Sequence, residues 1–154
     1  MNTIIVEGGK DMGNRIYPIG IQNFEKIRKE GYVYVDKTAL MYKLVKSGSY
    51  FFLSRPRRFG KSLLISTLEA YFEAKRDLFE GLAVETLEKD WVKRPVFHLD
   101  LNIGKYDTPD SLDKILNETL DYWESLYGTR SAETTLALRF AGVVGRAYEQ
   151  SGER

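Results

Sequence analysis

Residues 50–65 constrain the fold of this chain more than any other stretch. An apolar run, Tyr50–Leu53, precedes a short basic loop, and the loop ends in Gly60–Ser62. A near-continuous apolar run is typical of a strand buried on both faces, as in parallel sheets covered by helices. Apolar side chains then recur at helical spacing from Lys61 to about Ala74. The stretch therefore predicts a strand, a tight loop and an amphipathic helix, in that order.

A Gly-Lys-Ser sequence between a strand and a helix is the arrangement that binds the phosphates of a nucleotide. Backbone N–H groups surround the anion, the lysine reaches the β- and γ-phosphates, and the serine hydroxyl binds Mg²⁺. We therefore expect residues 55–62 to form a phosphate-binding loop for ATP and Mg²⁺, with Ser62 as the metal ligand. The residues expected to contact the nucleotide are Arg57, Arg58, Phe59, Gly60, Lys61, Ser62 and Leu63.

The loop departs from the general pattern G-x-x-x-x-G-K-[ST], because Arg55 stands where that pattern has its first glycine. Pro56 fixes its own φ and favours extended geometry at Arg55, so the strand can continue by one residue. The sequence leaves open whether Arg55 faces the phosphates or points away. An alternative interpretation is that Arg57 and Arg58 are solvated loop charges and that Gly-Lys-Ser only begins a helix.

The rest of the chain alternates between predicted helices and a second strand, Pro95–Leu101. Such alternation is typical of βαβ units. We therefore predict an α/β fold, a P-loop NTPase-like three-layer αβα arrangement with a parallel sheet. Because the chain closes on a helix, we expect this fold to be incomplete at the C-terminus. The other predicted helices follow Asn23, run from Asp36 to Gly48, cover 84–92, extend from Thr108 or Asp110 to Gly128, and span Ala132–Glu149.

Asp100 closes the second apolar run, in the position of an acid that helps to hold Mg²⁺. A structural role at the strand end is the preferred interpretation, and Mg²⁺ contact is the alternative. His98 is the only histidine and lies in the same apolar run, so we expect a core histidine. With no cysteine and one histidine, a transition-metal site is not expected.

Composition limits the classes of protein to consider. The 154 residues fit one domain, with 1–15 as a flexible lead-in and 16–154 as the folded part. No secretory signal or membrane-spanning apolar run is visible, so we expect a cytoplasmic protein without a membrane partner. The net charge of +1 argues against a broad nucleic-acid footprint. A non-enzymatic fragment or interaction module, whose basic loop binds nucleic-acid or protein phosphates, remains the alternative function. The oligomeric state is left open.

Several segments together resemble the N-terminal part of the bacterial AAA-ATPase-like family, over about residues 16–154. In that family an arginine is expected at position 55. The resemblance implies ATP binding, with Lys61 and Ser62 at nucleotide-binding positions. The segments that carry it are Gly20–Arg28, Tyr34–Thr38, Ser54–Ser62 and Pro95–Leu101.

The resemblance also implies what a complete member would add. The family's Walker B strand, an apolar run ending in Asp-Glu, would be expected just after residue 150. Members often carry a restriction-endonuclease-like C-terminal domain, which implies a nucleic-acid partner for the complete protein. We therefore expect this chain to be a truncated piece, and its resemblance leaves ATP hydrolysis by the chain itself open.

Overall fold

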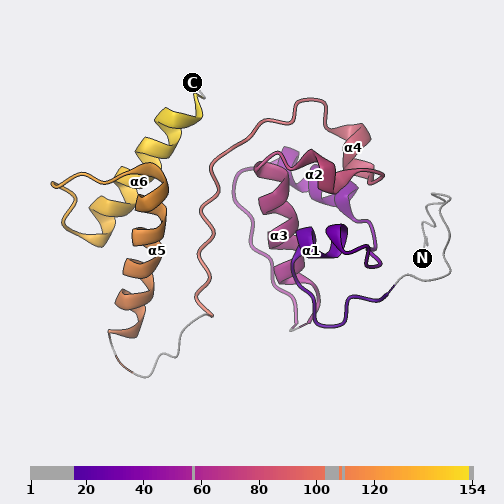
Figure 1. Cartoon of the computed structure of the whole chain (residues 1–154), viewed down its shortest axis with the longest axis horizontal. Helices are drawn as coiled ribbons and strands as arrows, with labels where there is room; N and C mark the ends of the chain where they lie inside the picture. The colour runs from indigo at the N-terminus through magenta and orange to yellow at the C-terminus, as the bar shows by residue number, and fades with distance from the viewer. Residues whose placement is uncertain (1–15, 57, 103–107, 109, 153–154) are drawn as a thin grey trace. The chain divides into compact units, whose positions relative to one another are not determined.

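The computed structural model describes residues 16–56, 58–102, 108 and 110–152 (Figure 1). The predicted lead-in, 1–15, therefore lies outside the described residues. The chain divides into two compact units, of which the first ends at Val92 and the second begins at Lys93. No helix in the described ranges is both long and apolar enough to cross a membrane.

The first unit is built from short helices. Helix α3 packs against α1, and α2 packs against α4. The elements are α1 (Phe24–Lys29), α2 (Thr38–Ser47), α3 (Lys61–Phe72), the 3₁₀-helix η2 (Arg76–Phe79) and α4 (Ala83–Leu87).

Local sequence signals set several of these helix ends. The Asn23 side chain accepts a hydrogen bond of 2.8 Å from the Lys26 N–H, which confirms the predicted N-cap of α1. Gly48 follows the last residue of α2, as predicted. Helix α3 ends at Phe72, two residues before the predicted end, and Ala74 beyond it has a left-handed φ of 56°.

An aromatic cluster forms the core of the first unit. Phe24 and Phe79 are fully buried, and their ring centroids lie 4.9 Å apart. Tyr34 packs edge-on against Phe24 at 5.1 Å, and Trp91 lies 5.2 Å from Phe79. This cluster connects α1, η2 and the segments that flank α2 and α4. It therefore stabilises the part of the first unit against which α3 packs.

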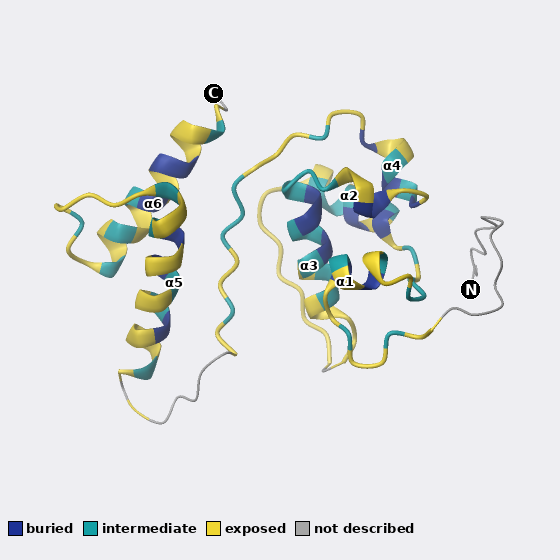
Figure 2. Ribbon diagram, viewed as in Figure 1, coloured by how far each residue is buried: buried dark blue, intermediate teal, exposed yellow. Residues whose placement is uncertain are grey.

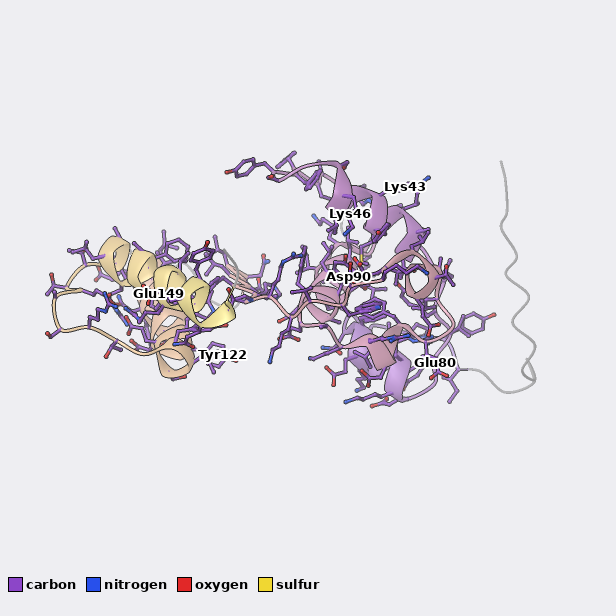
Figure 3. The ribbon with its side chains drawn as sticks, turned by 90° about the horizontal axis from the view of Figure 1, so that it is seen from above. Lys43, Lys46, Glu80, Asp90, Tyr122 and Glu149 are labelled. Atoms are coloured by element: carbon purple, nitrogen blue, oxygen red, sulfur yellow. The ribbon has the colours of Figure 1, made fainter. Side chains whose placement is uncertain are left out.

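At the edge of this core, Lys46 connects α2 to the segment after α4. Its ammonium nitrogen lies 5.1 Å from the centre of the Tyr42 ring and 3.3 Å from a carboxylate oxygen of Glu88 (Lys46 is labelled in Figure 3). Glu88 is buried and also accepts a hydrogen bond from the Tyr71 hydroxyl on α3. The carboxylate therefore joins α2 and α3 at one point.

The second unit is a pair of packed helices, α5 (Ser111–Tyr127) and α6 (Leu136–Ser151). Gly128, at φ 87°, ends α5 as predicted, and the Thr135 hydroxyl caps the first turn of α6. Phe97, from the preceding extended segment, packs against Trp123 at a centroid distance of 5.1 Å. Across the helix pair, Arg139 donates hydrogen bonds of 2.8 and 2.6 Å to the two carboxylate oxygens of Glu124.

The predicted α/β fold with a parallel sheet is wrong for the described residues, which form helices and irregular segments but no strand. Tyr50–Leu53 forms neither helix nor strand, and Tyr50 and Phe52 are 96% and 93% exposed. Figure 2 shows the segment between α2 and α3 as exposed. A strand requires a hydrogen-bonded neighbour, and an apolar run alone does not supply one. The Pro95–Leu101 run is likewise not a strand.

Two glycines of α6 give a direct test of its packing. A Cβ on Gly142 would lie 2.0 Å from a Glu133 carboxylate oxygen, whereas a Cβ on Gly145 would meet nothing within 4 Å. Glu133 pairs with Arg146 at 2.6 Å, and both side chains are largely buried. We expect Gly145→Ala to stabilise α6 by about 1 kcal/mol through helix propensity. In Gly142→Ala the same gain in helix propensity is offset, because the new Cβ displaces the Glu133 carboxylate from its ion pair with Arg146.

Urea unfolding of the two single variants checks this expectation. Gly145→Ala should be more stable than Gly142→Ala by about 1–2 kcal/mol. Equal stability of the two variants would contradict the observed placement of Glu133.

Candidate functional site

The predicted phosphate-binding residues lie where an extended segment enters α3. We call residues 55–62 the basic loop. Arg58 and Gly60 both have left-handed backbones, with φ 66° and 76°. Gly60 is the N-cap of α3, and its carbonyl accepts the first helical hydrogen bond, 3.0 Å from the Leu64 nitrogen. Arg57 lies outside the described residues.

The first turn of α3 carries free backbone donors. The first N–H groups of any helix have no partner within the helix, and a side chain often satisfies one of them. Asn23 does so for α1 and Thr135 for α6, whereas α3, like α2, α4 and α5, has no side-chain cap. The N–H groups of Lys61 and Ser62 are therefore open to an anion, and the helix dipole favours negative charge at this end.

The side chains of this turn are open as well. Arg58, Lys61 and Ser62 are all exposed. Within the described part of the chain, none of the three has a hydrogen bond or ion pair to another residue. The site thus combines cationic groups, a hydroxyl and backbone donors, and no described carboxylate neutralises it.

Arg55 is oriented across the loop. Its guanidinium donates a long hydrogen bond of 3.4 Å to the carbonyl oxygen of Phe59. This bond lies within the basic loop and joins residues four positions apart.

Helix α3 is anchored to α1 by a serine that the sequence analysis did not single out. The Ser66 hydroxyl accepts a hydrogen bond of 3.0 Å from the Phe24 N–H, and it lies 3.0 Å from the Gln22 carbonyl oxygen. Ser66 stands one helical turn after Ser62, so these bonds fix the direction in which the start of α3 points. Its sequence separation from Phe24 is 42 residues, and no local pattern reveals the contact.

The sequence predicted a helix from Asp36, but α2 begins at Thr38 with Lys37 as its N-cap, and the Asp36 carboxylate bonds to the starts of two helices. One carboxylate oxygen accepts hydrogen bonds from the N–H and the hydroxyl of Thr38, at 2.8 and 2.7 Å. The other accepts from the Ala83 N–H at 2.7 Å, at the start of α4. The Thr38 hydroxyl in turn accepts from Val84. This pair therefore connects the N-termini of α2 and α4, and its role is structural.

Asp100 and His98 belong to the second unit. An Asp100 oxygen accepts hydrogen bonds from the backbone N–H and side-chain amide of Asn102, at 2.9 and 3.0 Å. These bonds lower the pKa of the Asp100 carboxyl below its usual value. These contacts are local, but the strand that Asp100 was expected to close is not present in residues 95–101. His98 is exposed, so its predicted place in a core is wrong.

Comparison with known proteins gives a family and one relative. A family model described as a predicted AAA-ATPase matches residues 18–154. An uncharacterized protein from the vnfD 5′ region of Azotobacter chroococcum mcd 1 is 38% identical over 145 residues. The match covers 93% of this chain but 28% of that protein. No solved structure gives a significant match.

Proposed function

This chain belongs to the predicted AAA-ATPase family, and we propose on that premise that the basic loop binds the triphosphate of ATP together with Mg²⁺. The observation that carries the proposal is the uncapped first turn of α3, which presents backbone donors beside the unpaired Lys61 ammonium. Anions bind at such helix starts through N–H groups and the helix dipole.

Each residue has a distinct part in this binding. Gly60 brings the backbone close to the anion, because it has no Cβ and adopts a left-handed φ. Lys61 neutralises charge on the β- and γ-phosphates, and Arg58 adds a second cation from the loop. Arg55 holds the loop closed through the Phe59 carbonyl.

Mg²⁺ fits the residues at this turn. The ion keeps several waters and needs only one or two protein ligands when phosphate oxygens are present. The Ser62 hydroxyl is exposed and makes no hydrogen bond to the described residues, so it is available as that ligand. When bound, the ion would supply positive charge against the phosphate oxygens.

We propose the binding step for this chain and not hydrolysis. Hydrolysis requires a group that positions the attacking water, commonly a carboxylate or amide side chain. No described residue of the basic loop carries either group. The chain spans about a quarter of its curated relative, so the activity of the whole protein is a further proposal.

Calorimetric titration with Mg·ATP tests the proposed function. We expect Lys61→Ala to weaken binding at least tenfold, since a hydrogen bond to a charged group contributes about 1.5–3 kcal/mol. The matched control is Lys43→Ala, an exposed lysine of α2 that is labelled in Figure 3 and should leave the affinity unchanged. Equal affinity of the wild type and Lys61→Ala, or no binding by either, would reject the proposal.

A second test uses the left-handed backbone of the loop. Arg58 and Ala74 are the described non-glycine residues with positive φ, at 66° and 56°. Glycine at either position relieves steric strain, so we expect Arg58→Gly and Ala74→Gly each to raise the free energy of unfolding by about 0.5–1 kcal/mol.

The two variants should differ in nucleotide affinity. Arg58→Gly removes a loop cation, so its affinity for Mg·ATP should fall severalfold, whereas Ala74→Gly should bind like the wild type. Urea unfolding and calorimetry measure the two quantities. Unchanged affinity in Arg58→Gly would remove this residue from the proposed site.

A further inference from the structure

The segment that leads from α2 into the basic loop exposes its aromatic side chains. Tyr50 and Phe52 are 96% and 93% exposed, and Phe51 between them is 52% exposed. Figure 2 shows the segment as part of the exposed surface. Single exposed apolar side chains are common on proteins, whereas neighbouring ones that form a patch indicate a surface that binds a partner.

The rings of Tyr50 and Phe52 are not used by the interior of the first unit. A pocket of about 520 Å³ lies beside the basic loop, and Leu53, Arg55 and Phe59 are among the residues that line it. Tyr50 and Phe52 do not line this pocket. Neither ring packs against another aromatic ring in the described part of the chain. The faces of both rings are therefore open to a ligand from outside.

The charges that accompany these rings are of one sign. No Asp or Glu occurs in the sequence between Asp36 and Glu69. Arg55 and Arg58 follow Phe52 in the same connection to α3, and both are exposed. The net charge of the whole chain is only +1, so the positive charge is concentrated in this part of the sequence. The surface is therefore complementary to an anionic ligand over a short length.

This combination of rings and cations favours single-stranded nucleic acid over other anions. The bases of a single strand have open faces that stack on tyrosine and phenylalanine rings, and arginine contacts the phosphates. In a duplex the neighbouring bases cover these faces. A duplex is also bound largely through many phosphate contacts, which a net charge of +1 does not favour. An acidic peptide would pair with the arginines but offers no bases for the rings.

We propose that Tyr50, Phe52, Arg55 and Arg58 form a binding site for single-stranded DNA or RNA. The two rings stack on bases, and the two guanidinium groups contact the phosphates. Arg55 donates one N–H to the Phe59 carbonyl oxygen and keeps its other donors for a phosphate. Arg58 also belongs to the proposed triphosphate site, whereas the two rings belong to the nucleic-acid site alone. Variants of the rings therefore separate the two sites.

Fluorescence anisotropy on the whole chain, without ATP, tests the proposal. The labelled probes are oligo(dT), oligo(U) and a DNA duplex of equal length. We expect the preferred single strand to bind about tenfold tighter than the duplex, because its bases are open to stacking. Tyr50→Ala and Phe52→Ala should each weaken single-strand binding about tenfold. The matched control is Tyr122→Ala, an exposed tyrosine of α5 that is labelled in Figure 3 and should bind like the wild type.

Further variants at Phe52 separate stacking from simple apolar contact. Phe52→Leu keeps an apolar side chain but loses the ring, so it should weaken single-strand binding as Phe52→Ala does. Phe52→Trp keeps a ring and should retain the affinity of the wild type. Because Tyr50 and Phe52 are almost fully exposed, their replacement should preserve the fold, and circular dichroism checks this. Calorimetry should show unchanged Mg·ATP affinity in Tyr50→Ala and Phe52→Ala.

The possible results separate this site from the proposed triphosphate site. The proposal is overturned if neither single strand binds tighter than the duplex, or if Tyr50→Ala and Phe52→Ala both bind single strands like the wild type. Polyglutamate that competes as well as an unlabelled single strand would also overturn it, since charge alone would then explain binding. Loss of Mg·ATP binding with single-strand binding kept would reject the proposed function and leave the nucleic-acid site standing.

Discussion

Replacing Phe24 by alanine is expected to destabilise the first unit by about 3–5 kcal/mol. Phe24 is completely buried, and its ring contacts both Phe79 and Tyr34. Removing the ring leaves a cavity among aromatic neighbours that can close only partly. Urea unfolding followed by circular dichroism measures the loss.

Phe52→Ala is the matched control for this prediction. Phe52 is 93% exposed, so its replacement should change the free energy of unfolding by less than about 0.5 kcal/mol. The comparison also tests the corrected fold. If Tyr50–Leu53 were a strand buried in a sheet, Phe52→Ala would cost several kcal/mol, as Phe24→Ala does.

Replacing Asp36 by alanine is the second large change, with an expected loss of about 2–4 kcal/mol. Its carboxylate accepts hydrogen bonds from two backbone N–H groups and one hydroxyl, at 2.7 to 2.8 Å. The Thr38 and Ala83 N–H groups that lose their acceptor are partly buried, so water replaces the carboxylate poorly.

Asp36→Asn should lose about half as much stability, because one oxygen is kept for Thr38 and the amide nitrogen cannot accept from Ala83. Urea unfolding gives the stabilities, and amide hydrogen exchange should show the loss at the start of α4. If Asp36→Ala instead kept full stability and lost ATP binding, Asp36 would be a residue of the binding site and its role would not be the structural one described above.

The helix ends were predictable from the sequence where a nearby residue causes them. Asn23 begins α1 through a bond to Lys26, and Gly128 ends α5 with a left-handed backbone. The start of α3 at Lys61, directly after Gly60, is likewise a local property. These helix ends depend on residues within one helical turn, so they can be predicted from the sequence of this chain alone.

The sheet could not be predicted correctly, because strands depend on distant partners. Tyr50–Leu53 has the apolar composition of a buried strand, but composition does not show whether a neighbouring strand is present. The same limit applies to the site. The hydrogen bond from Ala83 to Asp36 spans 47 residues. The pocket beside the basic loop is likewise lined by residues that range from Tyr17 to Thr67, and no local sequence motif predicts contacts between residues so far apart.

In the proposed function, phosphate groups bind the backbone N–H groups at the start of α3. Amide chemical shifts measured by NMR during titration with Mg·ATP and with Mg·tripolyphosphate test this claim most directly. We predict that the largest shift changes with both ligands occur at Gly60, Lys61, Ser62 and Leu63. Changes confined to other residues, or none at saturating ligand, would contradict it.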